Sequence, residues 1–171
     1  GRPRRKAGML NKGKKPAPEK FVRFYEHYVT NLPELSKAAA GNGSFCPAVE
    51  HDGIIRRIPL LIGQMQQEGQ KKAEIYPALS LETLRVALKK KFYVVESYGE
   101  ATENGYGIAS IKIGDYTIPT DSDGMVDVYY SGHKPWRYIP AWRIMDGSVT
   151  EARVKDKIVL IGASAIGLKD V

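Results

Sequence analysis

The stretch PALSLETLRVALKKKFYVVE, residues 77–96, indicates the fold class because a helix pattern in it runs directly into a strand pattern. Its first part, residues 77–91, places three leucines at the spacing of one helix face. Those leucines are Leu81, Leu84 and Leu88. Three lysines fill the last turn of this predicted helix, where positive charge is favourable to the helix dipole. The run FYVVE at 92–96 then predicts a strand, since β-branched and aromatic residues favour extended chain.

Two predicted hairpins lie on either side of this stretch. Residues 44–62 contain two apolar runs around His51-Asp52-Gly53, and Asp-Gly between such runs is a strong turn signal. Residues 108–119 repeat the pattern around Gly114-Asp115. Because hairpins outnumber crossovers, the sequence predicts an α/β fold whose mixed sheet contains hairpins and flanking helices.

Shorter elements are expected in the rest of the chain. Residues 33–40 and 140–145 are typical of short helices, with Asn31 as a plausible cap for the first. Residues 125–130 predict a further strand. The run KIVLIG at 157–162 is typical of a buried strand that enters a glycine-rich loop.

Residues 1–20 carry the whole charge excess of the chain. The formal net charge is +7, and this segment holds eight Lys and Arg side chains against one Glu. Its Pro and Gly content predicts a solvated loop or tail, so we expect a basic polar leader or internal loop over 1–20 and one domain part over 21–171. Because the rest of the chain is electrically balanced, a nucleic-acid partner is not expected.

Several protein classes are excluded by composition. Cys46 is the single cysteine, so no disulfide forms within the chain. No run approaches the roughly 20 apolar residues that a membrane-spanning helix needs. The basic start is not followed by the apolar stretch of a signal peptide. The chain starts with Gly and stops soon after a strand pattern, so we expect both ends to lie within a longer polypeptide.

No catalytic or metal-binding pattern emerges. The loop at 162–167 lacks the Lys-Ser/Thr pair of a phosphate-binding P-loop and the second glycine of a dinucleotide fingerprint. Asp121, Asp123 and Asp127 have Gly124 among them, but not at the position that a calcium-binding EF-hand requires. The three histidines are too scattered for a zinc site. We therefore predict no catalytic residue, no metal and no cofactor.

Aromatic side chains gather near the carboxyl end of the chain, with two arginines among them. Such a mixture suits a ligand pocket or an interface, because Tyr and Trp offer large, rigid contacts that are both apolar and polar. Half-buried packing in a core is the commoner role of such residues. The aromatic residues are Tyr129, Tyr130, Trp136, Tyr138 and Trp142.

Four blocks of the chain, in order, resemble one known family. The blocks are GSF at 43–45 with DGIIRRIPL at 52–60, YP at 76–77 with SLE at 80–82, IPTD at 118–121 with Gly124, and KIVLIG at 157–162 with Ser164, Gly167, Leu168 and Asp170. Together they resemble the second class of CHASE-type domains, the cyclase- and histidine-kinase-associated sensory extracellular modules of bacteria. The run IPAWR at 139–143 looks most like versions attached to class III adenylate or guanylate cyclases.

The resemblance implies a sensor rather than an enzyme. Family members lie on the periplasmic or extracytoplasmic side of the inner membrane as parts of integral membrane proteins, and their output domain is a cytoplasmic nucleotide cyclase, histidine kinase or Ser/Thr kinase. The family also has an amino-terminal half, so the chain is expected to be the carboxy-terminal part of a larger sensor domain, with an open sheet edge. A homodimer is expected as well, since these output domains work as pairs. The signal, a small molecule or a protein, is not identified by the resemblance.

Candidate ligand contacts follow from composition and turn positions. An Arg side chain holds a carboxylate or phosphate with two hydrogen bonds, and a Trp ring stacks on a flat ligand. The candidates are Asp52, Arg56, Asp121, Tyr130, Trp136 and Arg137. The alternative is a cytosolic α/β binding module or small hydrolase whose basic leader contacts an anionic partner.

Overall fold

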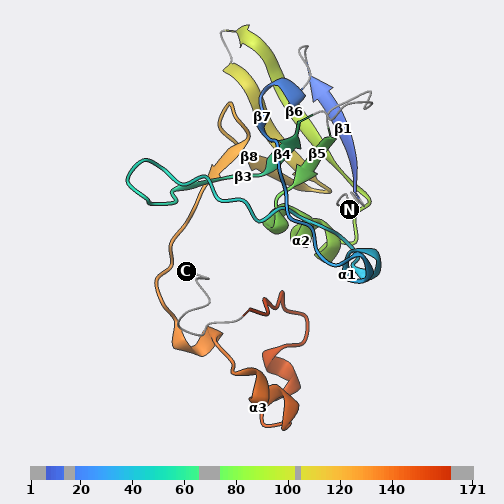
Figure 1. The fold of residues 1–171 in the computed structure, drawn as a ribbon, viewed down its shortest axis with the longest axis vertical. Helices are drawn as coiled ribbons and strands as arrows, with labels where there is room; N and C mark the ends of the chain where they lie inside the picture. Colours follow the sequence, from blue (N-terminus) through green and yellow to red (C-terminus); the bar gives the residue numbers. More distant parts are fainter. Residues whose placement is uncertain (1–6, 14–17, 66–73, 103–104, 163–171) are drawn as a thin grey trace. The chain divides into compact units, whose positions relative to one another are not determined.

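The computed structural model describes residues 7–13, 18–65, 74–102 and 105–162. The chain divides into two units, residues 1–129 and 130–171, and each is described by itself (Figure 1). The elements of the first unit are β1 (Gly8–Gly13), a 3-10 turn (Pro18–Lys20), β2 (Arg23–Tyr25), α1 (Pro33–Ala38), β3 (Arg57–Pro59), β4 (Leu61–Gln64), β5 (Glu74–Pro77), α2 (Leu79–Ala87), β6 (Phe92–Thr102), β7 (Gly105–Ile113), β8 (Tyr116–Pro119) and β9 (Met125–Asp127). The described part of the second unit contains α3 (Ala141–Met145) between two 3-10 turns (Pro135–Arg137 and Glu151–Arg153).

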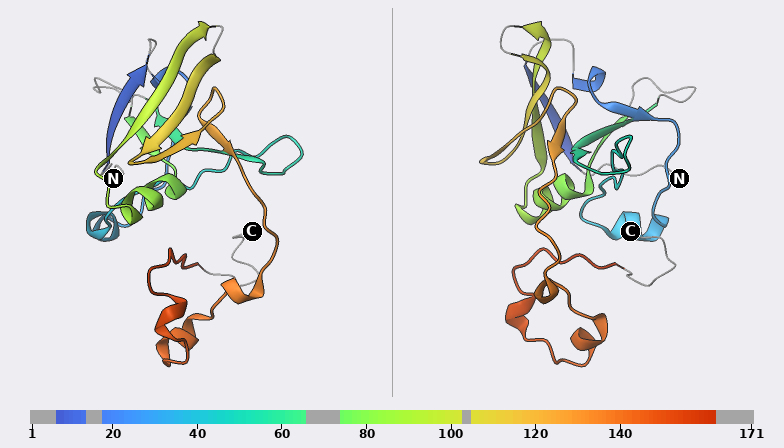
Figure 2. Two further views of the ribbon diagram at one scale, coloured as in Figure 1. Left: turned by 180° about the vertical axis from the view of Figure 1, so that it is seen from behind. Right: turned by 90° about the vertical axis from the view of Figure 1, so that its left-hand side faces the viewer.

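The strands form three sheets, two of which mix parallel and antiparallel pairs. The first has the order β1-β6-β7-β8, with β1 parallel to β6 and the other pairs antiparallel. The second has the order β2-β4-β5, with β2 parallel to β4 and β4 antiparallel to β5. The third is the antiparallel pair β3-β9. Figure 2 shows β6 and β7 side by side. The predicted mixed α/β fold is confirmed.

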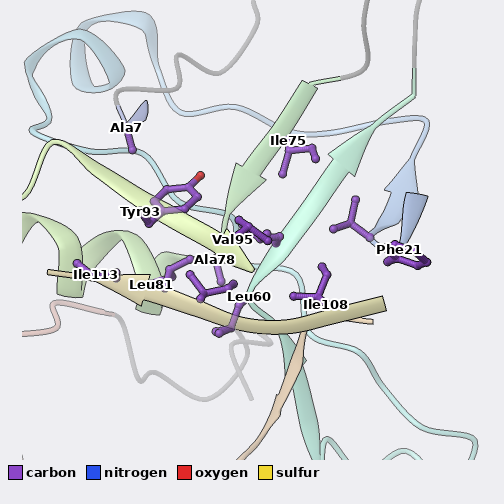
Figure 3. Close-up of a cluster of buried hydrophobic side chains, with 13 residues drawn as sticks. Ala7, Phe21, Leu60, Ile75, Ala78, Leu81, Tyr93, Val95, Ile108 and Ile113 are labelled. Carbon is purple, nitrogen blue, oxygen red and sulfur yellow. The ribbon is translucent and has the colours of Figure 1, made fainter. Parts of the chain in front are cut away.

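The core of the first unit joins its two larger sheets to α2 (Figure 3). Tyr93 of β6 and Ile111 of β7 come from the first sheet, and Leu61 and Ile75 come from the second. Leu81 of α2 completes the cluster. Each large apolar side chain buried in this way contributes about 1.5–3 kcal/mol to stability.

Helix α2 confirms the predicted apolar stripe but is shorter than predicted. Leu81 is buried, and Leu84 and Leu88 pack against the core. The helix ends at Ala87, and Lys89 adopts a left-handed φ of 53°. The lysine cluster therefore follows the helix, and the prediction that it fills the last turn is wrong. The left-handed residue redirects the chain into β6 at Phe92.

One predicted hairpin is confirmed, and the other forms only its turn. β7 and β8 pair around Gly114, whose positive φ suits a tight turn. In residues 44–62 the turn at 51–53 forms, but the two arms share a single antiparallel bridge, between Ala48 and Arg57. β3 pairs with β9 instead, and β4 pairs with β2 and β5. The distant pairings bring Leu61 into the core, which a local hairpin does not provide.

The basic leader is not all loop. β1 lies inside residues 1–20 and pairs in parallel with β6, so the prediction of a loop is wrong over Gly8–Gly13. The physical reason is apolar anchoring: Ala7 belongs to the core and Met9 packs against it. Lys12 lies exposed 3.7 Å from Glu96, and a charged side chain is what an edge strand tolerates.

The second unit leaves most of its apolar side chains exposed, and none of its described residues is buried. α3 confirms the predicted short helix. The predicted buried strand over 157–162 is wrong, because these residues are irregular and exposed, and Ile161 is 96% accessible to solvent. No strand pairing is found for them within the described residues. The predicted glycine-rich loop from residue 163 onward lies outside the described residues.

Candidate functional site

A pocket of about 570 Å³ lies on the β2-β4-β5 sheet of the first unit. Tyr25 of β2 stands opposite Gln64 of β4, and Ile62 of β4 stands opposite Tyr76 of β5. Because alternate residues of a strand point to opposite faces, these four side chains share one face of the sheet. All four line the pocket.

The other face of the same sheet belongs to the core. Leu61 alternates with Ile62 along β4 and is fully buried. Phe24, opposite Gly63, packs against the core cluster. A Cβ atom at Gly63 would lie 2.4 Å from a ring carbon of Phe24, so glycine allows this ring to cross β4 closely. The sheet thus has one apolar face and one face that carries the pocket.

The loop at 42–46 forms a wall of the pocket and is fixed by the backbone. The amide of Ser44 donates to the carbonyl of Pro77 at 2.7 Å, and the amide of Leu79 donates to the carbonyl of Ser44 at 2.8 Å. A Cβ atom at Gly43 would lie 2.5 Å from the Cα atom of Leu79, so only glycine permits this approach. The side-chain amide of Asn42 donates to the carbonyl of Ser36 in α1 at 3.3 Å. The wall is therefore preformed.

A buried ion pair supports the same loop from α2. Arg85 donates two hydrogen bonds to the Glu82 carboxylate, at 2.7 and 2.8 Å, and the side chains are only 8% and 3% exposed. The Glu82 carboxylate raises the pKa of Arg85 above its usual value. The Nη2 group of Arg85 that donates to Glu82 also donates to the carbonyl of Ala40 at 3.3 Å. This contact connects α2 to the loop that leads from α1 to the pocket.

Gln64 is the unusual member of the lining. Its side chain is 4% exposed, and neither the oxygen nor the nitrogen of its carboxamide has a hydrogen-bond partner in the described structure. A buried polar group left in this state costs about 1–3 kcal/mol. Buried polar groups are nearly always paired, so the state of this carboxamide is unusual.

Two tyrosines share the face of the sheet that carries Gln64: Tyr25 stands opposite Gln64, and Tyr76 stands opposite Ile62. Burial, and secondly a hydrogen bond with the Cys46 thiol, raise the pKa of Tyr25 above its usual value. The hydroxyl of Tyr76 donates to the Glu74 carboxylate, which lies two residues earlier on β5. Both aromatic side chains are therefore held by a hydrogen bond on the same face of the sheet as the carboxamide.

The lining is mostly apolar with several polar groups, and it contains no Asp, Glu, Lys or Arg among the described residues. It combines aromatic rings with hydroxyl and amide groups from five polar positions besides Gln64. Those positions are Thr30, Asn31, Ser36, Asn42 and Ser44. A mostly apolar cavity of this volume with a few convergent polar groups is typical of a small-molecule site.

The sequence-predicted contacts in the first unit lie in a separate network of exposed charges. Arg56 donates to Asp52 at 2.7 and 3.1 Å and to Glu50 at 2.7 Å. Arg57 pairs with Asp121 at 3.1 Å and lies 3.7 Å from Glu50. Arg56 lowers the pKa of Asp52 below its usual value, and Asp52, followed by Glu50, raises the pKa of Arg56. The structure therefore brings Asp52 and Arg56 together and connects Asp121 to them through Arg57.

The other three predicted contacts belong to the second unit. Tyr130 and Trp136 are exposed. Arg137 donates to the Ser131 hydroxyl at 3.2 Å, and the carbonyl of Trp136 accepts from Arg153 at 2.6 Å. None of the six sequence-predicted contacts lines the pocket. Their role in binding a ligand stays a prediction.

The sequence reasoning missed Gln64, Tyr25 and Tyr76. One local signal existed for Gln64, because the run LLIGQ at 60–64 ends an apolar strand pattern on an uncharged amide. Tyr76 belongs to the YP block of the family resemblance, but that block does not say what the side chain contacts. Tyr25 had no local signal, since β2, β4 and β5 come from separate parts of the chain.

The family model of the CHASE2 domain matches residues 7–171. The chain belongs to the CHASE2 family. The resemblance carried by the four sequence blocks is thereby confirmed. No curated protein and no solved structure matches the chain.

CHASE2 domains are extracytoplasmic sensory domains and are not catalytic. Among the described residues, no group of three or more His, Cys, Asp or Glu side chains is placed to hold a metal ion. In the same residues, no helix has the length and apolar character needed to cross a membrane.

Proposed function

We propose that this CHASE2 chain is the ligand-binding sensor of a bacterial transmembrane receptor, on the extracytoplasmic side of the inner membrane. In this proposal a signal molecule binds the pocket on the β2-β4-β5 sheet and regulates a linked cytoplasmic output domain. The observation that carries it is the unpaired, buried carboxamide of Gln64 in a pocket of small-molecule volume. A sensor needs only two conformations and a ligand that binds one of them better.

The output domain we propose is a class III adenylate or guanylate cyclase. Support comes from the run IPAWR at 139–143, which resembles CHASE2 domains attached to such cyclases and includes the start of α3. A histidine kinase or a Ser/Thr kinase is the alternative output. Because all of these outputs work as pairs, the proposal includes a homodimeric receptor and needs no nucleic-acid partner.

Membrane topology tests the sensor role. A reporter enzyme that is active only outside the cytoplasm would be fused after residue 171 in the full-length parent protein. We expect activity from this fusion and silence from a cytoplasmic reporter at the same site. The reverse result would overturn the proposal and favour a cytosolic binding module.

The output is tested in membranes that contain the full-length parent. We expect cyclic nucleotide to form from ATP or GTP, at a rate that depends on the occupancy of the pocket. Phosphorylation of the receptor without cyclic nucleotide formation would replace the cyclase with a kinase output and leave the sensor role intact.

A second set of ligand contacts also stays a prediction. Substitution of Arg56 and of Arg137 by alanine in the full-length receptor tests this second set independently of the pocket, because neither residue lines the pocket. If both variants keep the fold and the ligand response of the wild type, the hypothesis that this set of residues contacts the ligand is rejected. The set comprises Asp52, Arg56, Asp121, Tyr130, Trp136 and Arg137.

A further inference from the structure

The chemistry of the pocket restricts the class of signal molecule, and this argument rests on the proposed function. The carboxamide of Gln64 has an NH2 group and a carbonyl oxygen side by side, and both are closed to solvent and without a partner in the described structure, so a ligand pairs with them once the side chain turns toward the pocket. A carboxamide of this kind pairs with an edge that offers an acceptor and a donor in the same arrangement. Amides, lactams and nucleobases carry such edges, and Gln reads the adenine edge with two hydrogen bonds in this manner.

The side chains of the lining offer no fixed charge to an ionised ligand. None of the described lining residues is Asp, Glu, Lys or Arg. A buried ionised carboxylate or ammonium without a counter-charge is strongly unfavourable. The charged network around Arg56 pairs its own acids and bases, and none of its members lines the pocket. The ligand that this lining favours is therefore uncharged.

The aromatic residues favour a flat ligand. Tyr25 and Tyr76 lie on either side of the β4 residues, on the same face of the sheet as Gln64. Phe45, on the fixed loop at 42–46, lines the pocket and is exposed. Aromatic rings stack on flat molecules with little loss of conformational freedom.

From these three observations we infer that the pocket binds an uncharged, flat molecule that presents an amide-type donor and acceptor edge to Gln64. The carboxamide then gains both missing hydrogen bonds, and the rings of the lining cover the flat body of the ligand. The backbone hydrogen bonds of Ser44 hold the pocket wall in place before the ligand arrives, which lowers the cost of binding.

The test measures binding of a small panel to the full chain by ligand-observed NMR and calorimetry, up to millimolar concentration. The uncharged probes are nicotinamide, benzamide, uracil and adenine, and the matched acids are nicotinate and benzoate. We expect at least one uncharged probe to bind. We expect nicotinate and benzoate to bind at least about tenfold more weakly than nicotinamide and benzamide, respectively. Absence of binding by all four uncharged probes, or preference for an acid, overturns the inference.

Two variants locate the site. Gln64→Leu is expected to lower the affinity for the bound probe by about 10- to 100-fold. The same variant should leave the midpoint of thermal unfolding unchanged or raise it, because it removes an unpaired buried amide. Asn11→Leu is the matched control: it removes an exposed carboxamide on β1, outside the pocket, and should leave binding unchanged. A Gln64→Leu chain that unfolds at lower temperature and still binds the probe assigns a structural role to Gln64 and overturns the inference.

The outcomes separate this inference from the proposed function. Loss of probe binding in Arg56→Ala but not in Gln64→Leu places the site in the charged network and overturns the amide inference alone. A cytoplasmic location in the topology experiment overturns the sensor role even where nicotinamide binds. An extracytoplasmic location with no bound amide leaves the sensor role standing and removes the ligand class.

Discussion

The two units of the chain differ in the burial of their large apolar side chains. In the first unit, Leu61, Tyr93 and Ile111 are fully buried between two sheets and α2. In the second unit no described residue is buried, and the two tryptophans, Trp136 and Trp142, are 65% and 63% exposed. The stability of the chain is therefore expected to come almost entirely from the first unit, since burial of apolar surface is the dominant favourable contribution to folding.

Two similar sequence runs show what makes the difference. FYVVE at 92–96 and IVLI at 158–161 are both apolar and both typical of strands. The first becomes part of β6, which hydrogen-bonds with β1 on one side and β7 on the other. For the second, no strand pairing is found in the described residues. An apolar pattern indicates that a run can be buried, and partner strands decide whether it is, because its backbone groups need hydrogen bonds there.

The largest expected effect comes from the buried arginine of the first unit. Arg85→Ala leaves the Glu82 carboxylate buried without a counter-charge and removes the hydrogen bonds to the carbonyls of Ala40 and Lys90. We expect the free energy of unfolding to fall by about 3–5 kcal/mol. Urea unfolding followed by circular dichroism measures this fall. Arg153→Ala, the same change at an exposed site of the second unit, should stay within about 0.5 kcal/mol.

A matched pair of leucines comes next. Leu61→Ala, at a fully buried position of β4, should lower the free energy of unfolding by about 2–5 kcal/mol, because it removes apolar contacts and leaves a cavity. Leu160→Ala, at a position that is 81% exposed, should change it by less than about 0.5 kcal/mol. Equal losses from the two substitutions would contradict the contrast between the units.

The features of the fold that the sequence predicts are the local ones. The stripe of α2 and the β7-β8 hairpin depend on residues close together in the chain, and both are confirmed. The pairing of β1 with β6 and of β3 with β9 joins distant segments. No local pattern specifies such a partner, which is why the leader strand and the true partner of β3 were missed.

The candidate site was less predictable for the same reason. Residue type alone favoured charged side chains such as Arg56 and Asp52 as ligand contacts. In the structure these two residues, four apart in the sequence, form an ion pair with each other. The importance of Gln64 depends on the absence of a hydrogen-bond partner in the described structure, a property that exists only after three strands assemble around it. A sequence shows the amide but not its unpaired state.

A smaller effect is expected on the pH dependence of the first unit. Lys112, followed by Ser110, lowers the pKa of Glu96 below the usual value of 4.5. A carboxyl group whose pKa is lower in the folded state contributes stability above pH 4.5, and this contribution disappears as the pH falls through the lowered pKa. Lys112→Met should make the loss of stability on acidification shallower, and Ser110→Ala should do so less. Urea unfolding in steps from neutral pH to below 4.5 measures the slopes, and identical slopes in wild type and Lys112→Met would reject the assignment.

The smallest expected effect is the change in tryptophan fluorescence between the native chain and the chain in urea. Trp136 and Trp142 are the only tryptophans in the sequence and both belong to the second unit, so tryptophan emission reports on that unit alone. Because both rings are more than half exposed, we expect the emission of the native chain to lie close to that of the chain in urea. Iodide should quench it almost as strongly in both states.

Urea unfolding then compares the two units in one sample. Circular dichroism should show a cooperative transition of the sheets in the first unit, whereas tryptophan emission should drift without a step at the same midpoint. Leu61→Ala supplies the control, because it should move the dichroism midpoint to lower urea and leave the emission curve where it was. A steep change in emission that coincides with the dichroism midpoint, and moves with it in Leu61→Ala, would show that the apolar side chains of the second unit become covered cooperatively with the first.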